Sequence, residues 1–272
     1  MSDAACVAFL QWALPRIGLR WAGFRRVRGQ VCKRVKRRLK ELELGGFADY
    51  RLCLEQDPLE WQRLDELCRV TISRFSRDWG VFERLRAGVL PELAQRAETE
   101  GRSSLRCWSA GCASGEEVYT LRIIWDLTAA SHFPSLDIAI IGTDTDEVML
   151  SRARAGLYRT SSLRELPAAF ISQAFERRCE LWTVREHHRR GVTFLKQDLR
   201  HQAPAGPFDL VLCRNLPFTY FAADLQRSVL ARIKAALTPG GYLIIGAREK
   251  LPDKTTAFEC DPVARQIYWR RC

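Results

Sequence analysis

A glycine turn followed by two adjacent acidic residues is the segment of this sequence best suited to chemistry. It reads Trp108-Ser-Ala-Gly-Cys-Ala-Ser-Gly-Glu-Glu117, an apolar strand end that passes through the turn into the start of a helix. In a phosphate-binding loop, Lys and Ser or Thr follow the glycines, and the helix N-terminus faces an anion. Glu116 and Glu117 stand at that place here, and Gly111 lets a ligand lie against bare backbone. Two carboxylates would repel phosphate and favour a cationic ligand.

A second segment ends in a carboxylate. Ile138-Ala-Ile-Ile-Gly-Thr-Asp144 is an apolar run typical of a buried parallel strand. An acid at the end of such a strand can accept hydrogen bonds from ribose hydroxyls. The glycine turn, the strand and Asp144 together indicate a nucleoside cofactor without a pyrophosphate, and S-adenosyl-L-methionine fits that description.

The elements that would position these residues alternate between strand and helix. Phe208–Cys213 and Gly241–Gly246 are predicted strands, and Leu225–Leu237 between them has apolar residues at helical spacing. This pattern predicts an α/β fold in which ligands bind beyond the carboxyl ends of the strands. Four polar or glycine positions lie at or just beyond apolar runs and are expected to line one crevice: Gly111, Asp144, Asp198 and Asn215.

Taken in order, the motifs of this chain resemble those of the CheR family, S-adenosylmethionine-dependent methyltransferases that esterify glutamate side chains of bacterial chemoreceptors. The resemblance covers most of the chain. It rests on six segments: Thr71-Ile-Ser-Arg-Phe-Ser-Arg-Asp78, Trp108–Glu117, Thr143-Asp-Thr-Asp146, Ala153-Arg-Ala-Gly-Leu-Tyr158, Gln197-Asp-Leu199 and Gly206-Pro-Phe-Asp-Leu-Val-Leu-Cys-Arg-Asn215.

The resemblance implies a fold and a cofactor site. The fold is a doubly wound, Rossmann-like class I methyltransferase sheet with a small N-terminal helical domain and a small antiparallel β insert. Arg77 and Glu117 would reach the methionine part of the cofactor, Asp144 would hold the ribose, and Asp198 and Leu199 would border the adenine. The full set of expected cofactor contacts is Thr71, Ser73, Arg77, Gly111, Glu117, Asp144, Asp198, Leu199, Arg214 and Asn215.

The same resemblance implies that Arg214, Asn215 and Tyr220 are the catalytic residues. In the family, a Tyr beside the methyl acceptor follows the Arg-Asn pair, but the spacer in this chain is one residue longer. Either Thr219 or Tyr220 therefore stands at the acceptor side. An ionised glutamate acceptor needs no general base near neutral pH, and an Arg such as Arg214 or Arg77 could steer it.

The chain departs from the family pattern at several positions. Thr71 and Ser73 replace an Asn and a Thr, Ser76 replaces the second Phe before Arg77, and Ala247-Arg248-Glu249 stands where the family has His-Ser-Glu. The first two replacements keep hydrogen-bonding side chains. The departures at Ser76 and at Ala247-Arg248-Glu249 concern which acceptor is methylated rather than whether a methyl group is transferred.

Two alternative functions remain open from the sequence. Asn215-Leu-Pro-Phe218 matches the Asn/Asp-x-Pro-Phe/Tyr pattern of methyltransferases that act on amino or amide groups, in which the Asn accepts a hydrogen bond from the target amine and the ring stacks on its flat face. With a net charge of +11, RNA is a conceivable substrate of that kind. The second alternative is a regulatory module that binds the cofactor without turnover.

The charge is concentrated near the start of the chain. Arg20 to Lys40 holds ten Lys or Arg and no acid, and Val27, Val31, Val35 and Leu39 recur every four residues. This predicts a basic amphipathic helix with one buried stripe. The family resemblance gives it a role in docking an acidic, helical protein substrate, and nucleic acid would be attracted by the same charge. We expect a helical domain over residues 1–75, a catalytic domain over 76–272 and the insert over 165–195.

Composition sets further expectations. The 272 residues are 47% hydrophobic and 28% charged, as in soluble globular proteins, and no uncharged run approaches the length of a membrane span. The ten cysteines are scattered, which favours reduced thiols and a cytoplasmic protein. No metal site is expected, and His187-His188 is expected at the surface.

Overall fold

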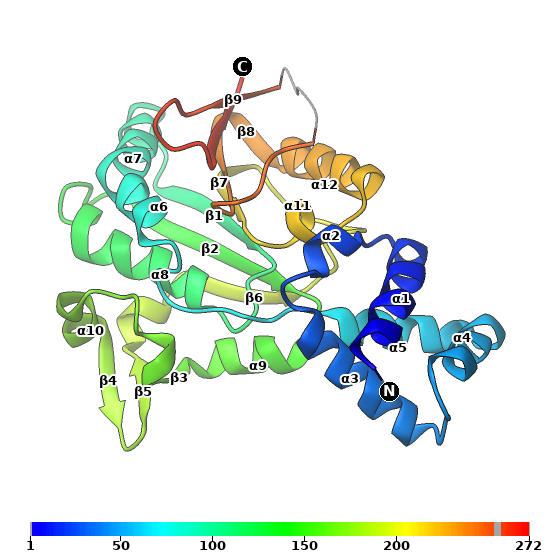
Figure 1. The fold of residues 1–272 in the computed structure, drawn as a ribbon. Coiled ribbons are helices and arrows are strands. Elements are labelled where there is room, and N and C mark those ends of the chain that lie inside the picture. Colours follow the sequence, from blue (N-terminus) through cyan, green and yellow to red (C-terminus); the bar gives the residue numbers. More distant parts are fainter. Residues whose placement is uncertain (1, 253–256, 272) are drawn as a thin grey trace. The chain divides into compact units, whose positions relative to one another are not determined.

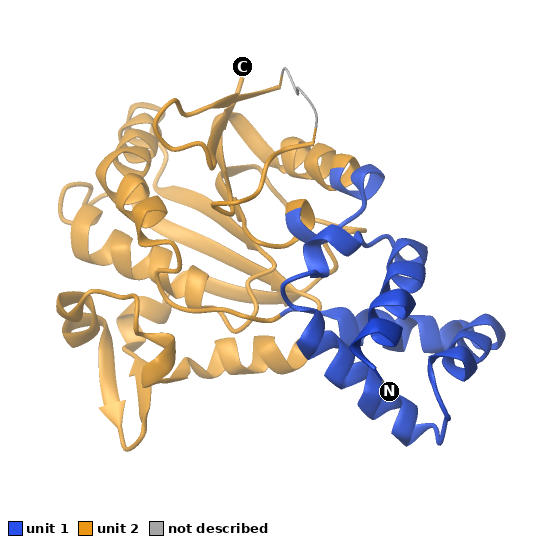
Figure 2. Ribbon diagram, in the orientation of Figure 1, with its two compact units in different colours: residues 1–70, 219–226 blue, residues 71–218, 227–272 orange. Residues whose placement is uncertain are grey.

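The computed structural model describes residues 2–252 and 257–271 and divides the chain into two compact units. The first comprises residues 1–70 and 219–226, and the second comprises residues 71–218 and 227–272 (Figure 2). The first unit thus contains, besides the N-terminal helices, a short segment from the second half of the chain.

The second unit is built on a seven-stranded sheet with the strand order β6-β2-β1-β7-β8-β10-β9 (Figure 1). The first five strands in this order run parallel, and β10 is antiparallel to both β8 and β9. The strands are β1 (Ser104–Ala110), β2 (Asp137–Asp144), β6 (Val192–Lys196), β7 (Phe208–Cys213), β8 (Leu237–Ile245), β9 (Phe258–Cys260) and β10 (Ile267–Arg270). All six side chains of β7 are buried, as expected for a central parallel strand.

Helices cover both faces of this sheet, which confirms the doubly wound α/β fold. Figure 1 shows α7 and α8 on one side of the sheet and α12 on the other. The helices that lie wholly in this unit include α6 (Trp79–Arg84), α7 (Leu90–Thr99), α8 (Glu116–Ile124) and α9 (Glu147–Ala155), whereas α11 (Pro217–Tyr220) and α12 (Ala223–Ala236) each contain residues of both units. π-helical turns extend α6 over Leu85–Val89 and α8 over Trp125–Ala129.

A second, three-stranded antiparallel sheet has the order β3-β5-β4. It consists of β3 (Leu157–Arg159), β4 (Phe175–Arg178) and β5 (Leu181–Val184), with α10 (Ala168–Ala174) preceding β4. Its first strand begins before the range 165–195 expected for the insert. The core side of this sheet is aromatic: Phe75 makes edge-to-face contacts with Tyr158 and Phe175, and all three rings are buried.

The first unit is helical. Its N-terminal part contains α1 (Asp3–Ala13), a 3-10 turn (Leu14–Ile17), α2 (Trp21–Phe24), α3 (Arg28–Glu41), α4 (Phe47–Gln56) and α5 (Pro58–Cys68). In α3, Val31, Val35 and Leu39 are buried, which confirms the predicted apolar stripe. The single basic helix expected over Arg20–Lys40 is wrong, because the chain breaks between α2 and α3 and Val27 stands before α3 as its N-cap.

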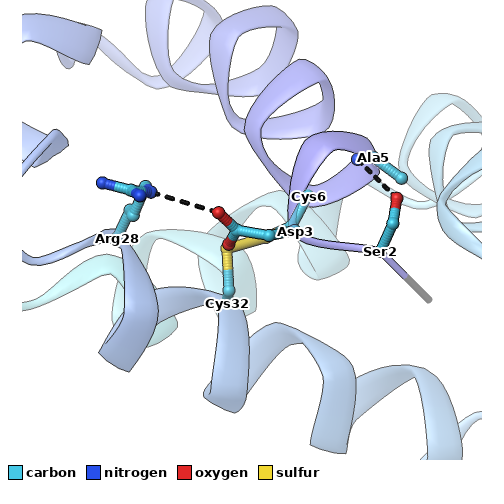
Figure 3. The surroundings of a disulfide bond; sticks show 6 residues. All are labelled: Ser2, Asp3, Ala5, Cys6, Arg28 and Cys32. Atoms are coloured by element: carbon cyan, nitrogen blue, oxygen red, sulfur yellow. Dashed lines mark hydrogen bonds and ion pairs between the residues drawn. A yellow bond between two sulfur atoms is a disulfide. The ribbon is translucent and has the colours of Figure 1, made fainter.

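Two expectations about cysteine and histidine are also wrong. Cys6 on α1 and Cys32 on α3 form a disulfide with their Cα atoms 6.0 Å apart, next to an ion pair between Asp3 and Arg28 (Figure 3). The cysteines lie 26 residues apart in sequence, so only the packing of the two helices brings them together. The surface position expected for His187-His188 is wrong for His188 alone: His187 is exposed, but His188 is fully buried and its Nδ1 lies 2.6 Å from Asp126 Oδ2.

Candidate active site

The predicted site residues of the second unit gather at the carboxyl ends of neighbouring parallel strands. Gly111 follows β1, Asp144 ends β2, Asp198 lies just beyond β6, and Arg214 follows β7. Because these strands are parallel and adjacent, their carboxyl ends meet at the same edge of the sheet. The residues that were expected from the sequence to line one crevice therefore lie at the same edge of the sheet, where the parallel strands end.

The glycine turn is tied to the end of β2 through backbone and carboxylate contacts. The N–H groups of Gly111 and Cys112 donate to the Thr143 carbonyl at 2.8 and 3.0 Å. Gly111 has φ +80°, and a Cβ there would lie 2.4 Å from Leu216 Cδ2. Only glycine fits this turn without displacing Leu216.

Asp144 anchors the same turn through its side chain. Its Oδ2 accepts the Ala113 N–H at 2.8 Å, and its Oδ1 accepts the Asp146 N–H at 2.9 Å. Burial raises the pKa of Asp144, although these backbone hydrogen bonds oppose the shift. Further donors to the carboxylate, such as sugar hydroxyls, would stabilise its charged form.

The two adjacent glutamates face different surroundings. Glu116 is 2% exposed and accepts the Ser114 hydroxyl on both oxygens, at 3.1 and 2.9 Å. Glu117 accepts Ser109 Oγ at 2.8 Å on one oxygen and Arg214 Nη1 at 3.0 Å on the other. The carboxylate pair expected from the sequence is therefore divided: Glu116 is held within the turn, and Glu117 belongs to a charged network.

Arg214 is the centre of that network. Its side chain is 2% exposed; Nη1 donates to Glu117, and Nη2 donates to the Arg77 carbonyl at 2.7 Å and to Asp78 Oδ2 at 2.8 Å. Its guanidinium carbon lies 5.2 Å from the centre of the Phe82 ring. Arg214 thus joins the end of β7 to α8 and to the segment before α6, and its charge is already balanced by two carboxylates.

Arg77 and Asn215 lie in contact beside this network. Arg77 Nη2 donates to Asn215 Oδ1 at 3.4 Å, and Nη1 donates to the Ile72 carbonyl at 3.0 Å. Asn215 has a left-handed backbone with φ +58°, which asparagine tolerates better than most residues. The structure thus brings together three predicted site residues, Arg77, Arg214 and Asn215.

The residues expected to border the adenine lie after β6. Asp198 is held by Arg200. The Arg200 Nε donates to Asp198 Oδ1 at 3.0 Å and to Oδ2 at 2.9 Å, and Arg200 Nη2 donates to Oδ2 at 2.7 Å. Burial tends to raise the pKa of Asp198, but the hydrogen bonds from Arg200 outweigh it and lower the pKa. Leu199 is buried, and its carbonyl accepts Arg232 Nη1 at 2.9 Å.

Three further predicted residues have less specific surroundings or lie elsewhere. Thr71 and Ser73 are half-buried in a segment without helix or strand. Tyr220 belongs to the first unit, where its ring packs on Phe24 with centroids 5.0 Å apart and its carbonyl accepts the Arg20 N–H at 2.8 Å.

Sequence reasoning missed Glu249 and Asp78 as members of the strand-end network. Glu249 Oε2 accepts the N–H groups of Asn215 and Gly246, each at 2.7 Å. Asp78 ends one of the motifs that carry the family resemblance, and Glu249 is the one residue of Ala247-Arg248-Glu249 that agrees with the family's His-Ser-Glu; these were the available signals. Their partners are far away in sequence, so the contacts themselves have no local pattern.

In the part of the chain that the structure describes, no cluster of three or more His, Cys, Asp or Glu side chains could hold a metal ion. Within the same residues, no helix has both the length and the apolar character needed to cross a membrane.

Comparison with known proteins decides which family has this arrangement. The model of the CheR methyltransferase S-adenosylmethionine-binding domain matches residues 71–267. The chain belongs to the CheR methyltransferase family. It is therefore an S-adenosylmethionine-dependent methyltransferase, and the cofactor expected from the glycine turn and Asp144 is confirmed by the family.

Relatives of this CheR-type chain include named chemotaxis enzymes. It is 37% identical over 194 residues to chemotaxis protein methyltransferase 1 of Pseudomonas aeruginosa, covering 68% of this chain and 69% of that protein. It is 33% identical over 231 residues to a probable chemotaxis protein methyltransferase of Rhizobium etli, covering 81% and 84%.

A larger relative shows that this CheR-type sequence also occurs within longer chains. An uncharacterised 104.1 kDa protein of Rhodobacter capsulatus is 32% identical over 225 residues, which is 82% of this chain but 23% of that protein.

Proposed function

We propose that this CheR-type enzyme transfers the methyl group of S-adenosylmethionine to glutamate side-chain carboxylates of a protein. When bound, the cofactor supplies a methyl group on a positively charged sulfur. The glutamate oxygen forms a bond to the methyl carbon as the carbon–sulfur bond breaks, which leaves a methyl ester and a neutral thioether. The named chemotaxis relatives support a protein as the substrate.

The observation that carries this proposal is the arrangement of acids at the strand ends. Asp144 is fixed to the glycine turn by two backbone N–H groups, and Glu117 is held across the same edge by Ser109 and Arg214. A ribose and a cationic methionine group would each find a carboxylate there. In this proposal Asp144 binds the ribose, Glu117 the methionine amino group, and Asp198 and Leu199 the adenine, with Thr71, Ser73 and Gly111 as further contacts.

Arg77 and Arg214 have different proposed roles. Arg214 is committed to Glu117, Asp78 and the Arg77 carbonyl, so it organises the site rather than contacting the acceptor. Arg77 is half-buried and makes a long contact with Asn215, so its guanidinium is the better placed to bind a carboxylate. A moderate contact is preferable, because tight pairing with the acceptor would stabilise the ground state.

The acceptor carboxylate itself needs no activation. Glutamate is ionised near neutral pH, so the protein has to position it and exclude water rather than remove a proton. We propose that Asn215 orients the reacting groups at the end of β7 and that Tyr220 acts on the acceptor side.

The nitrogen-methylation alternative is less well supported by the structure. It needs the side-chain oxygen of Asn215 to accept a hydrogen bond from the target amine and the Phe218 ring to stack on the substrate. The long contact between Asn215 Oδ1 and Arg77 leaves that oxygen able to accept from an amine, but Phe218 is 2% exposed. A buried ring offers no face to a substrate.

The partner in this proposal is an acidic, helical protein region, and the site of action is the cytoplasm. The outer face of α3 supports the first point, because Arg28, Lys33, Arg37 and Lys40 are exposed along it. The proposed cytoplasmic location is supported by the seven described cysteines that are free thiols, as is usual in a reducing compartment, whereas the Cys6–Cys32 disulfide counts against it.

A labelling experiment tests the proposed function. Purified enzyme is incubated with methyl-labelled S-adenosylmethionine and host extract, and the label is followed in protein, RNA and small-molecule fractions. We expect label in protein that mild alkali releases as methanol, because carboxyl methyl esters hydrolyse there. Alkali-stable protein label, or label in RNA, would contradict the proposal and favour nitrogen methylation.

A further inference from the structure

One buried carboxylate at the strand ends belongs to no expected contact with cofactor or acceptor. Glu249 is 8% exposed and follows the end of β8. Its Oε2 accepts two backbone N–H groups, from Asn215 and from Gly246, each at 2.7 Å. Charged acceptors with two amide donors at this distance make strong hydrogen bonds.

These two amides lie beyond the point where the sheet ladder ends. β7 and β8 pair in parallel up to Cys213 and Ile245. Gly246 comes directly after the end of β8 and Asn215 two residues after the end of β7, where no strand pairing holds them at a fixed distance. Glu249 therefore continues the connection between the two strands through its side chain.

Gly246 shows how closely this clamp is packed. A Cβ on Gly246 would lie 2.8 Å from Glu249 Oε2 and 2.9 Å from Asn215 Oδ1. Both distances are shorter than van der Waals contact, so a side chain there would displace either the carboxylate or the asparagine amide. Close packing thus fixes the positions of three groups relative to one another: the Gly246 backbone, the Glu249 carboxylate and the Asn215 side chain.

The constraint acts on the residue that contacts Arg77. Asn215 holds a left-handed backbone at φ +58°, and its Oδ1 accepts from Arg77 Nη2 at 3.4 Å. The left-handed conformation costs free energy for a residue other than glycine, less for asparagine than for most, and contacts with the surroundings hold it in place. The hydrogen bond from the Asn215 N–H to Glu249 Oε2 holds the Asn215 backbone.

We propose that Glu249 is a positioning residue for methyl transfer: it holds Asn215 in the left-handed conformation that aims its side chain at Arg77 and at the reacting groups. This inference rests on the proposed role of Asn215 in the site. It adds a residue whose carboxylate acts through another residue and needs no contact with cofactor or acceptor.

The test is a double-mutant cycle read on cofactor affinity, which needs no knowledge of the acceptor. Wild type, Glu249→Ala, Asn215→Ala and the double variant are titrated with S-adenosylmethionine in a calorimeter. We expect each single variant to bind about ten-fold more weakly and the double variant to bind no more weakly than Asn215→Ala alone, because one residue acts through the other. Losses that multiply, or a Glu249→Ala affinity equal to wild type, would overturn the proposal.

Two further variants separate positioning from a general loss of stability. Glu249→Gln keeps one oxygen that can face both amides, so it should restore most of the affinity. Gly246→Ala removes no acid but crowds the clamp, so it should reproduce the loss if Glu249→Ala proves too unstable to measure. Arg248→Ala, an exposed residue of the same turn, is the matched control and should bind like wild type.

Turnover gives a second readout once an acceptor is in hand. With that acceptor, Glu249→Ala should lower kcat even when kcat is expressed per functional S-adenosylmethionine-binding site, whereas a purely structural loss would lower only the number of such sites and leave kcat per site unchanged. If wild type forms no carboxyl ester with any acceptor, the proposed function fails, but the affinity cycle still decides whether Glu249 acts through Asn215.

Discussion

At the residue scale, Asp144 shows how one side chain can serve both the fold and the ligand. It holds the glycine turn through the Ala113 and Asp146 amides and has its pKa raised by burial. Protonation removes acceptor capacity from the carboxylate. We therefore expect S-adenosylmethionine affinity to fall as the pH is lowered, starting at a higher pH than for an exposed aspartate.

Calorimetric titration of wild type and Asp144→Asn across acidic pH checks this prediction. The substitution should weaken binding by about ten-fold at neutral pH and remove most of the pH dependence. Asp137→Asn, at the opposite end of the same strand and largely exposed, is the control. An unchanged pH profile in Asp144→Asn would show that another group titrates.

Arg214 leads to a prediction on stability as well as activity. Arg214→Ala leaves the carboxylates of Glu117 and Asp78 without their shared partner, and removing one member of a buried ion pair costs about 3 kcal/mol. We expect a loss of that size in the free energy of unfolding, measured by urea denaturation, together with loss of methyl transfer.

The matched control is Arg178→Ala, which removes an ion pair with Glu176 whose side chains are 64% and 53% exposed. An exposed pair of this kind contributes at most about 1 kcal/mol. Equal losses in the two variants would contradict the central place of Arg214 in the network.

The sequence predicted which residues belong to this site better than it predicted which of them contact one another. Asp144, Asp198 and Asn215 were placed at strand ends because an apolar run followed by a polar residue marks such an end, whereas Arg77 and Arg214 were assigned to the site through the family resemblance. The sequence could not show that Arg214 is occupied by Glu117 and Asp78, or that Glu116 turns away from Glu117. Those outcomes depend on contacts between residues far apart in the chain.

At the scale of elements, a buried carboxylate ties three helices of the first unit together. Glu60 on α5 accepts Tyr50 Oη of α4 at 2.6 Å and Arg38 of α3 at 3.0 and 2.7 Å. Burial tends to raise the pKa of Glu60, but the hydrogen bonds from Arg38 and Tyr50 lower it overall. An acid with a lowered pKa in the folded state stabilises the fold above its ordinary pKa, and that contribution is lost as the pH falls.

We therefore expect wild type to lose stability as the pH is lowered through the ordinary glutamate range and below. Glu60→Gln should cost about 2 kcal/mol at neutral pH and show a shallower pH dependence, as measured by urea unfolding at several pH values. Glu66→Gln, in an exposed pair with Arg63, should keep the wild-type dependence. A Glu60→Gln curve parallel to wild type would rule out Glu60 as the titrating group.

Apolar runs and helical spacing carried most of the element prediction, and packing explains its failures. The strands Ile138–Asp144 and Phe208–Cys213 were found because continuous apolar runs are typical of buried parallel strands, and the helix before β8 was found because its apolar residues recur at helical spacing. The continuous basic helix failed because charge and a valine every fourth residue do not reveal a chain break. The disulfide between Cys6 and Cys32 was missed because scattered cysteines give no sign of which helices will pack together.

At the scale of the whole molecule, the excess positive charge is the property to test. Lys33, Arg37 and Lys40 are exposed on α3. Changing all three to Gln should raise the KM for an acidic protein acceptor about five-fold at low salt, with little change at high salt, because screening already weakens the attraction there. Affinity for S-adenosylmethionine should stay as in wild type.

The control for this experiment removes the same charge elsewhere. Arg159, Arg178 and Arg185 are exposed in and beside the small sheet, and their replacement by Gln lowers the net charge equally. A similar rise in KM in both triple variants would show that net charge, rather than the α3 surface, attracts the acceptor.

The two-part organisation was predicted only in outline. A basic helical part and an α/β part follow from charge and periodicity. The grouping of residues 219–226 with the N-terminal helices does not, because it depends on long-range backbone contacts such as the Ala222 N–H to the Gly18 carbonyl at 2.8 Å. For the same reason, the longer spacer after Asn215 could not be interpreted from the sequence.

The central claim is that a CheR-type site methylates glutamate carboxylates of a protein. The most direct measurement is mass-spectrometric mapping of the methylated residue in the protein labelled by the wild-type enzyme, with Arg214→Ala, which we expect to lose methyl transfer, as the inactive control. We predict an added methyl group on glutamate side chains, lost after mild alkali. A methyl group on asparagine, glutamine, lysine or a nucleobase would contradict it.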